Sequence, residues 1–328
     1  MAGRTAPNFT LMYDMRAPAF GAPATALYAA ALDQCEWADR LGFAEVVLNE
    51  HHNTADGYLP SPRVMAGAIA ARTSQLRIHL SALVVTLHDP LHVAEDLAVL
   101  DVLSNGRVDV TLGAGYRREE FLMFGTNWKR RPSLMREAVR LMRAAWSGEP
   151  FEHNGTTVRV LPRPVQATIP LWLAGSSEGA ARRAAELDIP FEPVGERWWE
   201  PYEDELRTLG RSVPPRPAPA TPATFLHVTN DPEADWARIA PHALHHTNEY
   251  ASYAKRKDLT PFPETTDPSV LLAGGDYRVV TPDECVELCN SLGAGGNLRF
   301  SPLLGGLDPD FAWESLHLFE REVLPRLA

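Results

Sequence analysis

Four polar residues, Asn49-Glu50-His51-His52, stand directly after an apolar run over residues 43–48. That run is too short for a helix and indicates a strand buried on both sides. An imidazole titrates near neutral pH, so a histidine beside a carboxylate is suited to carry a proton. In the alternative interpretation, one histidine caps the strand end and the other is solvated. Because adjacent side chains of an extended chain point to opposite faces, His51 is the first candidate and His52 the second.

Two glycine-containing loops also follow predicted strands. Gly113-Ala114-Gly115-Tyr116 follows β-favouring residues at 108–112, and its glycines let another group approach the backbone closely. Gly175-Ser176-Ser177 lies between an apolar strand and a predicted helix. Amide N–H groups and hydroxyls at a helix N-terminus bind phosphate well. Ser177 as an ordinary helix cap is the alternative, and both roles can hold together.

The elements that must position these residues alternate between strand and helix with short connections, which is typical of a parallel α/β sheet. Asn105-Gly106 ends the helix that begins at Pro90, since both residues tolerate the left-handed conformation. Asn154-Gly155 predicts a β-hairpin within residues 151–160. The expected strands are 9–13, 43–48, 76–85, 108–112, 169–174, 189–194, 225–228 and 297–301.

This count gives about eight βα units, the number that closes a barrel in a chain of 328 residues. We therefore predict the α/β class, a (β/α)8 TIM barrel with an added hairpin and long loop insertions in its second half. One domain is expected over residues 1–328, with insertions at about 195–224 and 231–276. A doubly wound sheet is the alternative, but it needs a Gly-x-Gly-x-x-Gly turn at the first helix, which residues 14–23 do not contain.

Composition limits the classes of partner. The formal net charge is −11, so a nucleic-acid or anionic-membrane surface is not expected. Three cysteines cannot build a disulfide framework, and no run reaches the roughly twenty apolar residues of a membrane helix. With no signal pattern at the N-terminus, the expected location is the cytoplasm. No metal site is expected. Two sets of histidines lack the ligand spacing of a zinc site and are expected to be solvated or locally bonded: His242, His245 and His246, and the pair His88 and His92 at a predicted helix start.

The order of helix, turn, strand and Gly-x-Gly loop from Leu100 to Tyr116 resembles the bacterial luciferase-like monooxygenase family, flavin- or deazaflavin-dependent (β/α)8 barrels. Glu50-His51-His52, followed by Gly57-Tyr58-Leu59-Pro60-Ser61-Pro62, resembles the family's second strand and the loop that leaves it. The resemblance implies that His51 lies beside the flavin ring and assists proton transfer. Glu50 and His52 are the lesser catalytic candidates.

The resemblance also implies a set of cofactor-binding residues. A cis peptide bond is expected at Ser81-Ala82, against the flavin ring, and the flavin phosphate is expected at the Gly175 turn. In the luciferases proper an arginine that pairs with the phosphate stands at the position of Ala114, so Arg117 or Arg118 would have to substitute. The complete set is Asn49, Ser81, Ala82, Gly113, Ala114, Gly115, Tyr116, Gly175, Ser176 and Ser177.

The predicted reaction is monooxygenation of a small organic substrate with O2 and reduced FMN, which a separate flavin reductase supplies. Hydride transfer with the deazaflavin coenzyme F420 is the first alternative, because that branch places an acidic residue and a histidine where Glu50 and His51 stand. A non-catalytic flavin-binding protein is the second alternative, which Ala114 favours. The resemblance further implies a homodimer.

Overall fold

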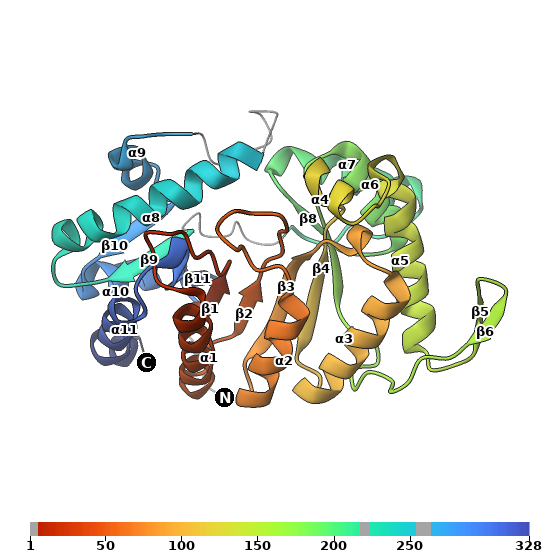
Figure 1. Ribbon diagram of the computed structural model, residues 1–328, viewed down its shortest axis with the longest axis horizontal. Coiled ribbons are helices and arrows are strands. Elements are labelled where there is room, and N and C mark those ends of the chain that lie inside the picture. The colour runs from red at the N-terminus through yellow and green to blue at the C-terminus, as the bar shows by residue number, and fades with distance from the viewer. Residues whose placement is uncertain (1–5, 217–223, 254–263, 328) are drawn as a thin grey trace. The chain divides into compact units, whose positions relative to one another are not determined.

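The computed structural model describes residues 6–216, 224–253 and 264–327, which form parts of two compact units (Figure 1). Unit 1 holds Met1–Val47, Thr54–Leu59 and Pro217–Ala328. Unit 2 holds Leu48–Asn53 and Pro60–Arg216. Asn49-Glu50-His51-His52 (the polar tetrad) and both glycine loops therefore fall in unit 2.

Unit 2 is built on four parallel strands whose order in the sheet is β3, β4, β7, β8. All five residues of β4 are buried, as expected for a strand inside a parallel sheet. Figure 1 shows α3 and α5 side by side in this unit, and α3 also packs against β4. The strands are β3 (Arg77–Leu83), β4 (Val108–Leu112), β7 (Leu171–Gly175) and β8 (Phe191–Pro193). The helices are α2 (Pro62–Arg72), α3 (Pro90–Ser104), α4 (Arg118–Met123), α5 (Arg131–Trp146), α6 (Glu178–Leu187) and α7 (Trp199–Thr208).

Local sequence signals set the helix ends in unit 2. Asp89 caps α3 by accepting bonds of 2.9 Å from two first-turn amides, and Pro90 occupies the first helical position. Asn105 ends α3 in the left-handed conformation, with φ at 56°. Ser177 caps α6. These ends fix where β4 and the turn after β7 begin, and so where the candidate site residues stand.

The predicted hairpin is confirmed. Strands β5 (Phe151–His153) and β6 (Thr156–Val158) pair antiparallel across Asn154 and Gly155, both with positive φ. Figure 1 shows this hairpin projecting away from the strands of unit 2.

Unit 1 contains a parallel pair, β1 (Asn8–Tyr13) with β11 (Asn297–Phe300), and a separate parallel pair, β9 (Phe225–Val228) with β10 (Tyr277–Val280). Strand β2 (Glu45–Leu48) ends where unit 2 begins. The helices are α1 (Ala24–Leu41), α8 (Pro232–Tyr253), α9 (Pro268–Ala273), α10 (Pro282–Leu292) and α11 (Pro309–Leu318).

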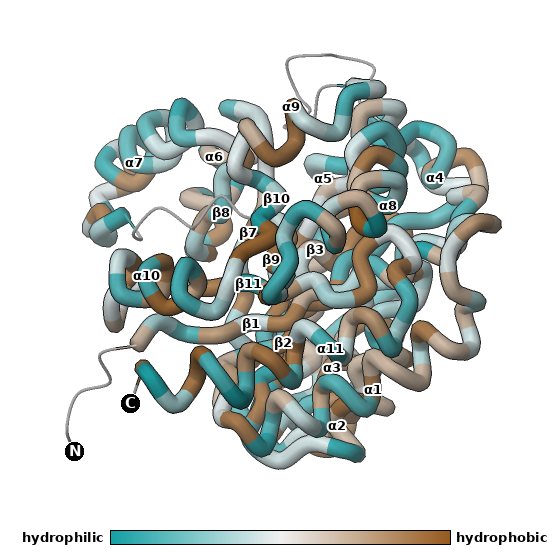
Figure 2. Tube along the Cα trace, turned by 90° about the vertical axis from the view of Figure 1, so that its left-hand side faces the viewer, coloured by the Kyte–Doolittle hydropathy of each residue, from teal (hydrophilic) through white to brown (hydrophobic). Residues whose placement is uncertain are grey.

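Aromatic rings fill the core of unit 1. Phe319 contacts Phe300 with ring centres 4.9 Å apart and Phe9 with ring centres 5.2 Å apart, and Phe43 packs on all three. Figure 2 shows apolar stretches concentrated in strands such as β7 of unit 2 and β9 of unit 1. Burial of these strand side chains is the main stabilising contribution within each unit.

Each of the eight expected strands is present, as β1, β2, β3, β4, β7, β8, β9 and β11. Strand β10 is an addition that the sequence analysis lacked. The expected insertions contain regular structure, α7 in the first and α8 with α9 in the second. Among the described residues, the helices lack the combination of length and apolar character that a membrane crossing demands.

Candidate active site

His51 is buried and contacts two residues that follow β4, the buried Glu120 and the half-exposed Tyr116. Its Nδ1 lies 2.8 Å from Oε1 of Glu120 on α4, and its Nε2 lies 3.2 Å from the hydroxyl of Tyr116. The backbone N–H of His52 donates to the same Glu120 oxygen at 3.1 Å, so that oxygen serves as an acceptor. Nδ1 of His51 therefore carries a proton and donates it to Glu120, and Nε2 is the nitrogen that faces Tyr116.

Arg117 fastens the tetrad loop to this cluster. Its Nη1 donates to the carbonyl oxygen of His52 at 2.7 Å and reaches Oε1 of Glu120 at 3.3 Å. Its Nη2 donates to the carbonyl oxygen of Asn53 at 3.4 Å. Arg118, by contrast, is exposed at the first position of α4. The described contacts of Arg117 thus lie at the loop that carries His51 and His52.

Glu50 and His52 belong to a second buried cluster, which His88 completes. Oε1 of Glu50 accepts from Nε2 of His52 at 2.8 Å and from Nε2 of His88 at 2.6 Å. The backbone N–H of Val84 donates to the other carboxylate oxygen at 2.6 Å. Burial alone would raise the pKa of Glu50, but these hydrogen bonds outweigh it and lower the pKa to about 2. Glu50 is consequently an anion at neutral pH that orients two histidines.

The ligand atoms of Glu50, His52 and His88 lie within 4.8 Å of one another, a spacing that a metal ion could use. In the described structure they are hydrogen-bonded to each other instead. Nη2 of Arg63 lies 3.4 Å from Nδ1 of His88, and an arginine can only donate, so Nε2 of His88 carries the proton given to Glu50. A cavity of about 240 Å³ is lined by this cluster together with Arg63, Asp96 and Phe124.

The ends of β3 and β4 approach each other closely. The Ser81–Ala82 peptide bond is cis, which confirms that prediction. A Cβ on Gly113 would stand 3.1 Å from Cβ of Ala82, so a larger residue there would press on this bond. Gly115 has a φ of +69°, and a Cβ on it would stand 2.9 Å from both Phe121 and Val84. The structure therefore brings together two of the predicted cofactor segments, one from each strand end.

The third predicted segment, Gly175-Ser176-Ser177, leads from β7 into α6. A Cβ on Gly175 would stand 2.3 Å from Cβ of Ala180, so the glycine allows the helix to begin directly against the strand. The Ser177 hydroxyl accepts from the amide of Ala180 at 3.3 Å, which confirms the helix-cap interpretation of that residue.

Two residues of these clusters were missed from the sequence. Glu120 is separated from His51 by 69 positions and His88 from Glu50 by 38. The only signal for Glu120 was an acidic residue soon after the Gly-x-Gly loop. His88 stands at a helix start, where hydrogen bonding to the backbone is an ordinary role for a polar side chain.

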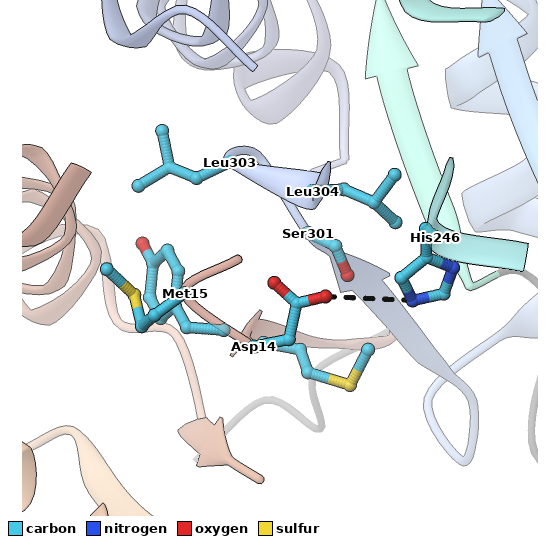
Figure 3. Close-up of a pocket in the computed structure, with 8 residues that line it drawn as sticks. Asp14, Met15, His246, Ser301, Leu303 and Leu304 are labelled. Atoms are coloured by element: carbon cyan, nitrogen blue, oxygen red, sulfur yellow. Dashed lines mark ion pairs between the residues drawn. The ribbon is translucent and has the colours of Figure 1, made fainter. Parts of the chain in front are cut away.

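Unit 1 has a buried polar cluster of its own, around a cavity of about 10 Å³, the room of about one water molecule. Figure 3 shows Asp14 and His246 facing one another, with Met15, Ser301, Leu303 and Leu304 also lining the cavity. Nε2 of His246 lies 3.8 Å from Asp14, and its Nδ1 lies 2.8 Å from the hydroxyl of Tyr277. Nearby, His245 bonds to Asp56 at 2.9 Å and His242 to a backbone carbonyl at 2.8 Å. Each of these three histidines, which were expected to be solvated or locally bonded, therefore makes a hydrogen bond to a residue distant in the sequence.

We expect the free energy of unfolding to fall as the pH is lowered from about 6.5 towards 3. Burial, then the positive charge of Arg16 and the neighbouring His245, lower the pKa of His246 from 6.5 to about 3. The unfolded chain therefore takes up this proton first, and the stability present above pH 6.5 is lost as the pH falls. Urea denaturation between pH 7 and 4 measures the effect, which should be smaller in His246→Gln.

The matched control for this experiment is His317→Gln, because His317 is exposed on α11. Its pH dependence should follow that of the wild type. Parallel curves for the wild type and His246→Gln would contradict the assignment. Asp14 has the opposite effect on the pH dependence of stability, because burial raises its pKa. The quantity to compare is therefore the difference between the wild-type and His246→Gln curves.

Residues 12–278 match a family model described as luciferase-like monooxygenase. An uncharacterized protein of Mycobacterium bovis is 31% identical over 183 residues, which cover 48% of this chain and 65% of that protein. An F420-dependent glucose-6-phosphate dehydrogenase of Amycolatopsis mediterranei is 26% identical over 181 residues, which cover 52% of this chain and 54% of that protein. The chain thus spans between half and two thirds of the length of these relatives.

Two solved structures are similar over nearly the whole chain. The monooxygenase RslO1 of Streptomyces bottropensis has a TM-score of 0.77 at 22% identity, over 98% of this chain and 100% of that one. The oxygenating constituent of 3,6-diketocamphane monooxygenase of Pseudomonas putida, in complex with FMN, has a TM-score of 0.70 at 18% identity, over 98% and 99%. At these identities the likeness shows the fold alone, and it confirms the predicted (β/α)8 TIM-barrel class.

Proposed function

This chain belongs to the luciferase-like monooxygenase family, and from that premise we propose that it is a flavin-dependent monooxygenase acting on a small organic substrate. The reaction consumes O2 and reduced FMN: one oxygen atom enters the substrate and the other leaves as water. A separate flavin reductase supplies the reduced FMN. The bound FMN supplies the electrons, and the residues below bind, orient and move protons.

The observation that carries this proposal is the position of the buried His51 between the buried Glu120 and the half-exposed Tyr116. Glu120 holds Nδ1 and so fixes both the ring orientation and the tautomer. Nε2 of His51 then takes up or releases the proton that oxygen transfer requires, with the Tyr116 hydroxyl in contact. Glu50 and His52 form the adjacent buried cluster, which holds the loop in place rather than exchanging protons.

The residues around His51 and Tyr116 fit a flavin. The buried Oδ1 of Asn49 has no hydrogen-bond partner within the described ranges, and an isoalloxazine N–H would satisfy it. The Ser81–Ala82 bond and the Gly113-Ala114-Gly115-Tyr116 loop would contact the ring. Gly175, Ser176 and Ser177, at the start of α6, would hold the phosphate. Two relatives in solved structures are monooxygenases, and one of them was determined with FMN.

Hydride transfer with coenzyme F420 is the second candidate. It is favoured by the F420-dependent relative of Amycolatopsis mediterranei and by a similar F420-dependent secondary alcohol dehydrogenase with a TM-score of 0.63. In this reaction the Glu50-His51 pair would serve a cofactor that transfers hydride without oxygen.

Anaerobic titration of the purified chain with reduced FMN, and separately with reduced F420, distinguishes the two reactions. We expect a saturable absorbance change with reduced FMN and none with F420 at the same concentrations. Admission of O2 to the FMN-loaded protein should then give substrate-dependent product in a screen of small ketones and aromatics. Binding of F420 alone would replace this proposal with hydride transfer, and binding of neither would favour a non-catalytic role.

We also propose a homodimer. Unit 2 exposes apolar side chains on two adjacent helices, Val64 on α2 and Val99, Val102 and Leu103 on α3, and these helices pack against each other. Covering such a face with a second copy would remove apolar surface from water. Light scattering should give twice the chain mass of 36.2 kDa, and a monomer mass would refute the dimer.

A further inference from the structure

Arg183 on α6 is a largely buried cation for which the described residues supply no ion-pair partner. Its side chain is 9% exposed, its Nε is buried without a hydrogen bond, and within the described ranges no ion pair reaches it. Burial lowers its pKa, the like charge of Arg136 lowers it further, and Glu186 opposes both. An arginine does not lose its proton in a protein, so an unpaired buried charge of this kind calls for an anion.

A second arginine, Arg131, stands near the first. Burial and then the charge of Arg183 lower the pKa of Arg131 to about 10. Arg131 is held firmly: Nη1 donates to the carbonyl oxygen of Gly115 at 2.7 Å, and its guanidinium lies 3.2 Å from the ring centre of Trp128. These contacts anchor Arg131 to the loop that contains Ala114.

The charge of Arg183 lies near the N-terminus of α6. Nη2 of Arg183 lies 4.0 Å from where a Cβ on Gly179 would stand, so its guanidinium reaches back to the first turn of the helix. In the described part of the chain, the amides of Glu178 and Gly179 have no acceptor. The one carboxylate of that turn, Glu178, is engaged by Arg182 at 2.8 Å. The turn thus offers donors and positive potential together.

We propose that Arg183 and Arg131, with the first turn of α6, bind the phosphate monoester of the flavin and replace the arginine that is absent at Ala114. This inference rests on the proposed function. A phosphate dianion between the two guanidinium groups satisfies the donors of Arg183 and removes the repulsion between the arginines. The site then selects FMN over riboflavin, which carries the same ring without the phosphate.

The test compares Arg183→Met with Arg140→Met, because Arg140 is an exposed arginine on the neighbouring helix α5. Anaerobic calorimetry with reduced FMN and reduced riboflavin gives both affinities. We expect the wild type to prefer FMN by tenfold or more, since hydrogen bonds to charged groups of about 1.5–3 kcal/mol are lost without the phosphate. Arg183→Met should lose most of that preference and keep its riboflavin affinity, whereas Arg140→Met should match the wild type.

A flavin-independent readout separates this inference from the proposed function. Inorganic phosphate should raise the Tm of the wild type and of Arg140→Met but not that of Arg183→Met. Without phosphate, Arg183→Met should melt no lower than the wild type, because it removes an unpaired buried charge. Equal FMN and riboflavin affinity in the wild type, or a phosphate response that survives in Arg183→Met, overturns the anion site. If neither flavin binds but F420 does, the proposed function fails and the phosphate response alone decides this site.

Discussion

Replacing His51 with asparagine is expected to lower kcat by about 10²–10⁴-fold, the usual contribution of a positioned general acid or base. Asparagine fills similar space and can still meet Glu120, but it cannot exchange a proton. The Kd for reduced FMN should therefore change far less than kcat. Single-turnover measurements, with oxygen added to the FMN-loaded protein, would separate the proton-transfer step from cofactor binding.

His92→Asn is the matched control for this prediction, because His92 lies exposed on α3 of the same unit. It should retain wild-type turnover. Glu120→Gln should lie between the two variants, since glutamine keeps an acceptor oxygen for Nδ1 but not the negative charge. Full turnover of His51→Asn would remove His51 from the reaction and leave it as a loop residue.

Replacing Arg16 with methionine is expected to lower the free energy of unfolding by about 3–5 kcal/mol, the usual cost of removing one partner from a buried ion pair. Arg16 is fully buried in unit 1 and pairs with Asp56 and, at 3.4 Å, with Asp14. Burial disfavours the charge of Arg16, but Asp14 and the other acidic neighbours raise its pKa above the ordinary value. Its guanidinium also lies 4.6 Å from the ring centre of Tyr58. Methionine would leave two carboxylates buried without their cation.

Arg40→Met serves as the control, because the side chain of Arg40 is 63% exposed and pairs with Glu36 within one helix. An exposed pair of this type contributes at most about 1 kcal/mol. Urea denaturation at pH 7 measures both variants. The double variant Arg16→Met with Asp56→Asn should recover part of the loss, since it removes one of the stranded charges. A loss in Arg16→Met no larger than in Arg40→Met would show that the buried cluster contributes nothing to stability.

The sequence predicted the elements that depend on local chemistry. Strand β4 was recognisable from its β-favouring residues, the end of α3 from Asn105-Gly106, and the hairpin from Asn154-Gly155. Strand β10 was missed because only its first residue, Tyr277, is buried, so the four residues lack the pattern of an interior strand. Its pairing with β9 comes from chain folding over some fifty intervening positions, which short-range periodicity does not report.

The candidate site, like the fold, was predicted from the sequence only in part. The tetrad after β2, the Gly113 loop and the Gly175 turn could be identified from residue types and their place after strands, and the resemblance added the cis bond at Ser81. What each histidine bonds to could not be identified. Glu120 sits in a run of charged residues that is typical of an exposed helix, yet it is fully buried against His51.

The family, the strand and helix pattern, and the segments that carry polar side chains could thus be predicted from the residues alone, because they depend on neighbouring positions along the chain. The folded chain alone shows that His51 pairs with Glu120, that His52 and His88 share Glu50, and that Arg183 is largely buried with no ion-pair partner among the described residues. Those facts arise from contacts between distant segments, where burial removes water and makes the presence or absence of a partner energetically decisive.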